Sequence, residues 1–246
     1  MLIKGLKRTS LIEYPGKISA VVFVGGCNFR CAYCYNVDLV ARPDEVPTIE
    51  EGSVLAFLRD RIGLLDAVCI TGGEPTLQPD LGGFLREVKA MGFLTKLETN
   101  GSRPRALEGL LGEGLLDLVA MDVKAPLRFD AYAKVAPNIT REDFEGVRGS
   151  FELLRASDAD VEFVTTAVPG LVGEAELLEI AKSIGRSKPY VIQQFKPGKC
   201  LDPSYSGLEP YPEEVLRGFA EKVGELARCS LRGLPQAGAK AVRQIP

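Results

Sequence analysis

The chain has 246 residues, of which 46% are hydrophobic and 26% charged, and its formal net charge is -3. A chain of this length can form one large α/β domain or two small ones, and its mildly acidic balance gives no general attraction to nucleic acid. There is no signal-peptide pattern after the first charged residues and no run of about 18 apolar residues that would span a membrane. We expect a cytoplasmic protein with no nucleic-acid or membrane partner, built as a single domain over residues 1–234 with a loose tail over residues 235–246.

Apolar segments rich in β-branched residues alternate with segments of helical spacing along the whole chain. The expected strands are residues 18–25, 66–71, 93–99, 115–123, 161–168 and 190–195, with a further short strand over 229–234. The expected helices are residues 49–62, 81–91, 105–111, 141–156, 174–184 and 213–227. Such alternation is typical of a parallel sheet covered by helices. Six units of this kind predict an α/β fold, a parallel, open or partial (β/α)6 TIM-like barrel, with a doubly wound open sheet as the competing topology.

Unusual short stretches follow each of the six expected strands. In chain order they are CNFRCAYC, GGEP, ETNG, MDVK, PG and KPGK. In parallel α/β folds the functional residues gather at the carboxyl ends of the strands, where the strands lead into the helices. We therefore expect these stretches to lie together on one rim of the sheet.

Three cysteines in the first of these stretches have the spacing C-x3-C-x2-C: Cys27, Cys31 and Cys34. A reducing compartment disfavours a disulfide framework. A tetrahedral zinc site needs a fourth ligand, and since the chain has no histidine, only Cys200 or Cys229 could complete it. Three thiolates on one short loop instead favour a cubane iron–sulfur cluster whose fourth iron is open to a further ligand.

The motif C-x3-C-x-aromatic-C, with Tyr33 as the aromatic residue, is followed one strand later by GGEP, and together they resemble the radical S-adenosylmethionine (SAM) superfamily. The longer stretch KRTSLIEYPGKISAVVFVGGCNFRCAYCYN resembles the opening of the activating enzymes of glycyl radical enzymes. Within these, the chain is most similar to the activating proteins of anaerobic ribonucleotide reductase and, more distantly, to that of pyruvate formate-lyase.

This resemblance implies a radical SAM barrel with a [4Fe–4S] cluster on Cys27, Cys31 and Cys34 and with SAM on the open iron. One electron would cleave SAM to a 5′-deoxyadenosyl radical, which would abstract a hydrogen atom. The implied partners are a glycyl radical enzyme as protein substrate and a reduced flavodoxin- or ferredoxin-type electron donor. Two alternatives stay open: a radical SAM enzyme acting on a small molecule, like 7-carboxy-7-deazaguanine synthase, and a non-enzymatic iron–sulfur or zinc-binding module.

The resemblance also implies a set of SAM contacts, while no single catalytic residue stands out. The expected contacts with the adenine, the amino group, the ribose and the carboxylate of SAM are Tyr33, Gly72, Gly73, Glu74, Pro75, Glu98, Asn100, Asp122 and Lys124. Plainer roles are open for some of them: packing for Tyr33, a turn for Asn100, and a structural ion pair for Asp122 and Lys124. The strands near the end of the barrel would add Thr165, Thr166 and Phe195 to the cavity wall. Tyr35 stands where related activating enzymes often have histidine, which leaves the adenosine contacts and the target open.

Overall fold

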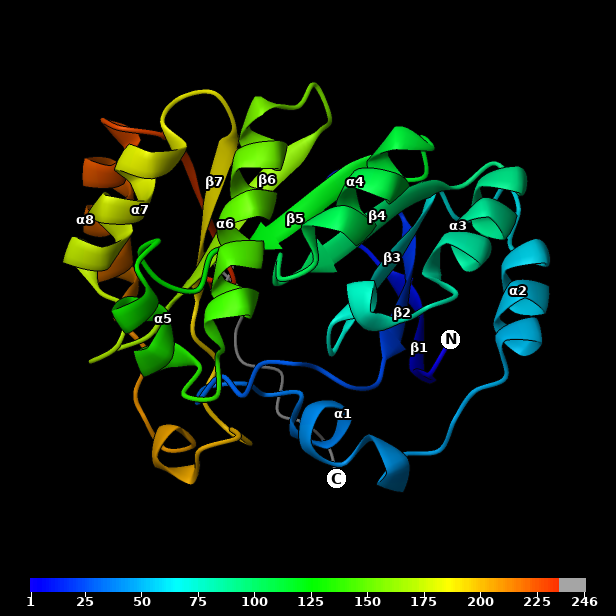
Figure 1. Cartoon of the computed structure of the whole chain (residues 1–246), viewed down its shortest axis with the longest axis horizontal. Coiled ribbons are helices and arrows are strands. Elements are labelled where there is room, and N and C mark those ends of the chain that lie inside the picture. The colour runs from blue at the N-terminus through cyan, green and yellow to red at the C-terminus, as the bar shows by residue number, and fades with distance from the viewer. Residues whose placement is uncertain (235–246) are drawn as a thin grey trace.

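The computed structural model describes residues 1–234 and contains one eight-stranded sheet (Figure 1). The strands follow one another in the order of the chain, so each is paired with its sequence neighbour. They are β1 (Ile3–Ser10), β2 (Ser19–Val24), β3 (Ala67–Gly72), β4 (Leu94–Thr99), β5 (Leu118–Asp122), β6 (Val161–Ala167), β7 (Pro189–Gln194) and β8 (Arg228–Arg232). The pairs from β2 to β8 are parallel, and β1 pairs antiparallel with β2. The expected tail over residues 235–246 lies outside the described residues.

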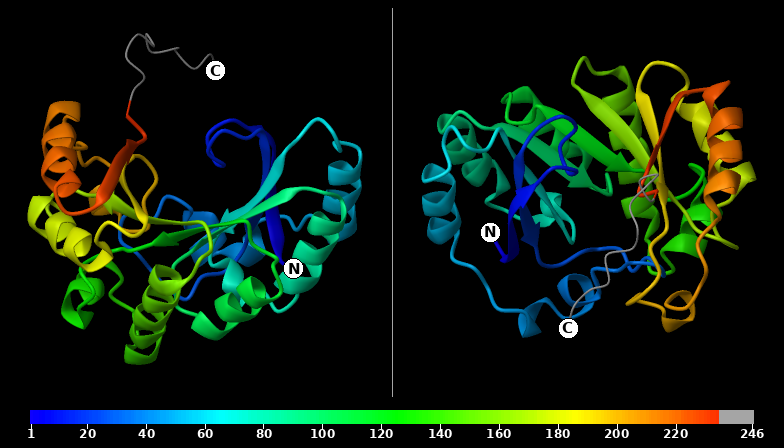
Figure 2. Two further views of the ribbon diagram at one scale, coloured as in Figure 1. Left: turned by 90° about the horizontal axis from the view of Figure 1, so that it is seen from above. Right: turned by 180° about the vertical axis from the view of Figure 1, so that it is seen from behind.

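The helices lie mostly along the convex face of the curved sheet (Figure 2). They are α1 (Val37–Ala41), α2 (Glu51–Arg59), α3 (Leu81–Ala90), α4 (Pro104–Gly112), α5 (Phe129–Val135), α6 (Arg141–Ala156), α7 (Glu174–Ile184) and α8 (Glu213–Gly224), with 3₁₀ turns η1 (Pro43–Glu45), η2 (Pro75–Leu77) and η3 (Pro203–Tyr205). Among residues 1–234, no helix covers the concave face between β1 and β8, the two edges of the sheet. Within residues 1–234 no helix has both the length and the apolar character needed to cross a bilayer.

Helix α6 shows how the sequence pattern builds this layer. Phe144, Val147, Phe151 and Leu154 recur at intervals of three or four residues, and all four are buried. This spacing places them on one side of the helix. The Phe151 ring packs against Phe163 of β6 with ring centroids 4.8 Å apart. Burial of each such side chain stabilises the fold by about 1.5–3 kcal/mol.

The expected barrel is confirmed, with one additional strand, β1. The six expected strands correspond to β2–β7 and the further short strand to β8. The doubly wound alternative is wrong because the strand order never reverses, as that topology requires. β1 is an additional strand that the sequence did not predict, and it pairs antiparallel with β2 at the edge of the sheet. The sequence of β1, IKGLKRTS, lacks an apolar run because it contains three basic residues. The buried Lys4 donates from Nζ to the Val46 carbonyl and to Thr48 Oγ1, both at 2.8 Å.

Candidate active site

The carboxyl ends of β2–β7 border a cavity of about 580 Å³. Every expected cluster or SAM residue lines it except Pro75, which is buried at the start of η2. Thr166 and Phe195 also line the cavity. Thr165 does not; it is buried and donates from Oγ1 to the Val123 carbonyl at 2.7 Å. The sheet therefore brings together residues that span about a hundred positions of the chain, from Cys27 to Lys124.

The cysteine loop is held on the rim by backbone hydrogen bonds to two distant segments. The Ala32 N–H donates to the Val135 carbonyl at 3.0 Å, at the end of α5. The Leu201 N–H donates to the Cys34 carbonyl at 3.0 Å. Burial raises the pKa of the Cys27 thiol to about 12 and that of the Cys31 thiol to about 11. Because the thiolate is the metal ligand, any cluster bound here must displace these protons.

The three thiols fit a cubane better than a single metal ion. Cys27, Cys31 and Cys34 all line the cavity, and their side chains are buried or half-buried. Within residues 1–234, no three His, Cys, Asp or Glu side chains converge as ligands of one ion would. Within these described residues, neither Cys200 nor Cys229 forms such a group with the three loop cysteines. In a cubane each thiolate binds its own iron, so the three sulfurs need not meet at one point.

The two glycines after β3 allow two backbone segments to come close together. Gly72 has φ of +115°, and a Cβ there would lie 2.6 Å from the Val24 backbone nitrogen. A Cβ on Gly73 would lie 1.9 Å from the Gly26 carbonyl oxygen. The Gly73 and Glu74 N–H groups donate to the Val24 and Gly26 carbonyls, each at 2.8 Å. The glycines therefore seat the GGEP loop against the start of the cysteine loop.

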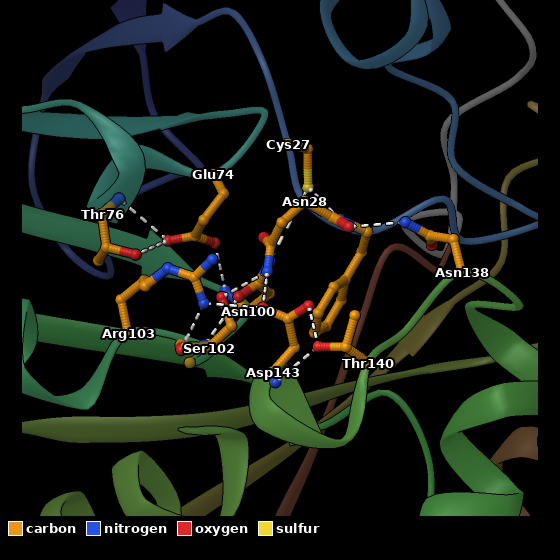
Figure 3. A network of polar contacts seen from close by, with 12 residues as sticks. Cys27, Asn28, Glu74, Thr76, Asn100, Ser102, Arg103, Asn138, Thr140 and Asp143 are labelled. Atoms are coloured by element: carbon orange, nitrogen blue, oxygen red, sulfur yellow. Dashed lines mark hydrogen bonds and ion pairs between the residues drawn. The ribbon is translucent and has the colours of Figure 1, made fainter. Parts of the chain in front are cut away.

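Glu74 lines the cavity and also accepts hydrogen bonds from protein groups on two loops. Its buried carboxylate accepts from Thr76 N at 3.0 Å, Thr76 Oγ1 at 2.6 Å and Thr99 Oγ1 at 2.7 Å through Oε1, and from Asn100 N at 2.7 Å through Oε2. Burial raises the pKa of this carboxyl, and the four hydrogen bonds oppose that shift. Glu74 thus joins the loops that follow β3 and β4 (Figure 3).

Asp122 and Lys124 form an ion pair on the cavity wall, with Lys124 Nζ 2.7 Å from Asp122 Oδ2. Burial by itself would lower the pKa of Lys124, but the charge and hydrogen bond of Asp122, together with the nearby Tyr33 and Cys31, raise the pKa well above its usual range. Lys124 is therefore charged at neutral pH. The buried Tyr33 hydroxyl has no hydrogen-bond partner within the described part of the chain, and it too belongs to a cavity residue. An unpartnered buried hydroxyl beside a charged pair fits a polar ligand in the cavity.

A second set of charged residues, centred on Lys96, connects several strands of the sheet. Sequence reasoning missed it. Lys96 on β4 is fully buried and donates from Nζ to the Glu13 carbonyl at 2.6 Å and to Glu162 Oε1 at 3.1 Å. Glu98 Oε1 is 3.2 Å from the same Nζ, and Arg232 donates to Glu162 Oε2 at 2.8 Å. We call these residues the Lys96 network. No local pattern identifies it, because only the curved sheet brings its members together.

Residues 21–184 match the family described as the radical SAM superfamily, and the chain therefore belongs to that superfamily. Membership implies a [4Fe–4S] cluster and SAM as the working cofactors. The fold agrees: a radical SAM methyltransferase from Sphaerobacter thermophilus superposes with a TM-score of 0.69 at 16% identity, over 91% of this chain and 69% of that one.

The chain is also similar to several named proteins, among them activating enzymes. The chain is 37% identical over 233 residues to a Methanocaldococcus jannaschii protein provisionally named glycyl-radical enzyme activating enzyme, and the match covers 92% of each chain. The pyruvate formate-lyase-activating enzyme of Streptococcus mutans is 34% identical over 136 residues, half of each chain. A shorter match to the 7-carboxy-7-deazaguanine synthase of Rhodospirillum rubrum is 36% identical over 102 residues, covering 42% of this chain and 41% of the relative. The resemblance drawn from the cysteine motif is thus confirmed.

Proposed function

We propose that this protein is a glycyl radical enzyme activase that uses SAM and a [4Fe–4S] cluster to take a hydrogen atom from a glycine of a partner enzyme, such as anaerobic ribonucleotide reductase. The observation that carries this proposal is one cavity lined by the three loop cysteines together with the polar ends of β3, β4 and β5. The M. jannaschii relative supports the class of target. A single radical SAM domain over residues 1–234 and a cytoplasmic setting, where thiols stay reduced, complete the proposal.

In this proposal the cluster is held by Cys27, Cys31 and Cys34, which leaves one iron for SAM. The bound cluster and SAM supply a one-electron cleavage that yields the hydrogen-abstracting 5′-deoxyadenosyl radical. Lys124 would bind the SAM carboxylate, and Asp122 would accept from a ribose hydroxyl, since both charges line the same wall. Tyr33 would lie against the adenine. Gly72, Gly73 and Pro75 would shape the loop near the SAM amino group, with Glu98 and Asn100 as further polar contacts.

The partner loop needs a way in, and the concave face provides one. Among residues 1–234, no helix covers this face between β1 and β8 (Figure 2). The cavity lining includes Ile12 and Glu13 from the loop after β1 and Arg232 from β8. An extended glycine-bearing segment could enter there without any helix moving aside. The electron would come from a reduced flavodoxin- or ferredoxin-type protein.

Two measurements test the proposal. Anaerobic reconstitution should give about four iron atoms per chain, and SAM should change the electron paramagnetic resonance spectrum of the reduced cluster. Mixing the reduced, SAM-loaded protein with a candidate glycyl radical enzyme should then produce a glycyl radical doublet. Absence of a cubane, or a cubane that SAM does not perturb, would overturn the proposal.

The second candidate function is favoured by the match to 7-carboxy-7-deazaguanine synthase. It keeps the radical chemistry and replaces the protein substrate by a small molecule. SAM cleavage that accompanies turnover of a small substrate, with no glycyl radical in any tested partner, would support this second function over the first.

A further inference from the structure

The sulfur of Cys27 is approached by two N–H groups. The Phe29 backbone N–H donates to Cys27 Sγ at 3.4 Å, and the Asn100 side-chain Nδ2 donates to it at 3.8 Å (Figure 3). The first donor is local to the cysteine loop. The second comes from the loop after β4, 73 positions further along the chain. Hydrogen bonds to cluster sulfurs help to set the reduction potential of iron–sulfur clusters.

The orientation of the Asn100 amide is determined by its other contacts. Its Oδ1 accepts from the Ser102 N–H at 2.8 Å, and its Nδ2 donates to Asn28 Oδ1 at 3.0 Å. With Oδ1 engaged by a backbone donor, the NH2 group faces Asn28 and Cys27. The Asn100 side chain is buried, so water does not compete for these contacts.

Asn28 is oriented in turn by Asp143 in the first turn of α6. Asn28 Nδ2 donates to Asp143 Oδ1 at 2.8 Å and to Ser102 Oγ at 3.0 Å, which leaves Asn28 Oδ1 toward Asn100. Asp143 is held in place because it accepts from Arg103 Nη1 at 2.7 Å and from Thr140 Oγ1 at 2.8 Å. Without Asp143 as acceptor, the Asn28 amide could rotate by 180° and present its NH2 group to Asn100.

We propose that Asn28 and Asp143 are positioning residues that aim the Asn100 amide at the Cys27 sulfur and so raise the reduction potential of the cluster. An N–H donor stabilises the more negative, reduced state of a thiolate-bound cluster more than the oxidised state, which is the physical reason for the direction. The inference rests on the proposed function, because it requires a cluster on Cys27.

The test is a redox titration of the reconstituted cluster without SAM, followed by electron paramagnetic resonance. The solution potential is held near the midpoint reduction potential of the wild-type cluster. Under this condition, Asn28→Ala should lower the ratio of reduced to oxidised cluster about threefold. A tenfold change would correspond to 59 mV for a one-electron couple. Asp143→Asn, which keeps the shape of the side chain, should give a smaller change in the same direction. The matched control is Glu145→Gln, the same loss of charge on the exposed side of α6, which should leave the ratio unchanged.

A double-mutant cycle separates positioning from a general structural effect. If Asn28 acts through Asn100, then Asn28→Ala should have no further effect on the ratio in an Asn100→Ala background. Additive effects would overturn the inference, as would wild-type ratios in variants that hold a full complement of iron. Loss of the cluster from both Asn28→Ala and Asp143→Asn would also overturn it, because the network would then build the loop rather than aim one amide. A wild-type protein that takes up no cubane would instead contradict the proposed function.

Discussion

Glu74 and Asn100 show that hydrogen bonds to neighbouring residues determine the role of each polar side chain at the strand ends. The Glu74 carboxylate accepts hydrogen bonds from Thr76, Thr99 and Asn100, and it thereby joins two loops. Asn100 then turns its own NH2 group toward Asn28 and the Cys27 sulfur. Residue types in a motif therefore indicate where the site is, and contacts between neighbours decide what each side chain does there.

Replacement of Cys31 by alanine should remove one cluster ligand with little effect on the fold. We expect Cys31→Ala to lower reductive SAM cleavage by at least about 100-fold, since loss even of groups outside the ligand set costs metal sites 10–100-fold. Iron content, SAM cleavage and thermal unfolding would be measured. Cys229→Ala, a half-buried cysteine of β8 outside the cavity lining, is the control and should keep full activity. An active Cys31→Ala protein would show that the cluster is held in another way.

Replacement of Gly73 by alanine should be strongly destabilising. The added Cβ would lie 1.9 Å from the Gly26 carbonyl oxygen, so one of the two backbone segments must shift. We expect a loss of about 2–4 kcal/mol in the free energy of unfolding, measured with urea. Gly83 of α3 has open space around its Cβ position, and Gly83→Ala should stabilise by about 0.5–1 kcal/mol. Equal stability of the two variants would refute this account of the GGEP turn.

Hydrogen bonds between neighbouring elements help to position the carboxyl ends of the strands, and those of Asp117 are an example. Asp117 lies just before β5 and accepts hydrogen bonds from α3 and from β4. Lys89 Nζ of α3 donates to both of its carboxylate oxygens at 2.8 Å. The Thr95 N–H of β4 donates to Oδ2 at 2.7 Å. This carboxylate therefore links α3 to β4 and β5. Asn100 directly follows the end of β4, and Asp122 is the last residue of β5, so this link also helps to position two site residues relative to each other.

Asp117 should make stability depend on pH. Burial acts to raise the pKa of this carboxyl, but its hydrogen bonds to Lys89 and Thr95 outweigh burial and hold the pKa below its usual value. A lowered folded-state pKa gives stability that is present above the unfolded pKa of about 3.9 and is lost as pH falls through the folded pKa. Asp117→Asn should cost about 1 kcal/mol at pH 7, and less near pH 3, in urea unfolding. The control is Glu113→Gln, because Glu113 forms an exposed ion pair with Arg86; this change should alter stability little at either pH. A loss of stability in Asp117→Asn that does not depend on pH would contradict the assignment.

The whole molecule is an open barrel whose two edges are connected through its interior. The Lys96 network joins the loop between β1 and β2, through Glu13, to β4, β6 and β8. Of these elements, β8 is an edge strand of the sheet, the loop follows the other edge strand, β1, and β4 and β6 lie in the middle. The network therefore links the loop after β1 to strands from the middle and the far edge of the sheet.

Removal of the lysine at the centre of this network should destabilise the entire fold. Lys96→Met leaves the Glu162 and Glu98 carboxylates without their shared cation, and the loss of one partner from a buried ion pair typically costs about 3–5 kcal/mol. Urea unfolding of Lys96→Met and of Lys7→Met would be compared. Lys7 lies 3.8 Å from Glu13 on the exposed side of β1, and its replacement should stay within about 0.5 kcal/mol of wild type. A Lys96→Met protein as stable as Lys7→Met would mean that the network contributes nothing to the fold.

The sequence by itself determined the features that depend on near neighbours. The strands β2–β7 and the longer helices follow from periodicity, and the cysteine loop is visible because its three thiols lie within eight residues. The short helices α1 and α5 were missed because five and seven residues show too little of a helical repeat. β1 was missed because Lys4, Lys7 and Arg8 interrupt the apolar pattern of IKGLKRTS.

Only the tertiary structure decided which groups meet across the molecule. Asp143 and Asn28 are 115 positions apart, and Lys96 lies 83 positions from the Glu13 carbonyl it binds. It also decided that Glu74 faces other loops and that Pro75 and Thr165 stay out of the cavity. The physical reason is that hydrogen bonds and ion pairs are set by the curvature of the sheet and the height of each strand end. Those quantities arise from packing of all the helices and strands together, and no short stretch of sequence encodes them.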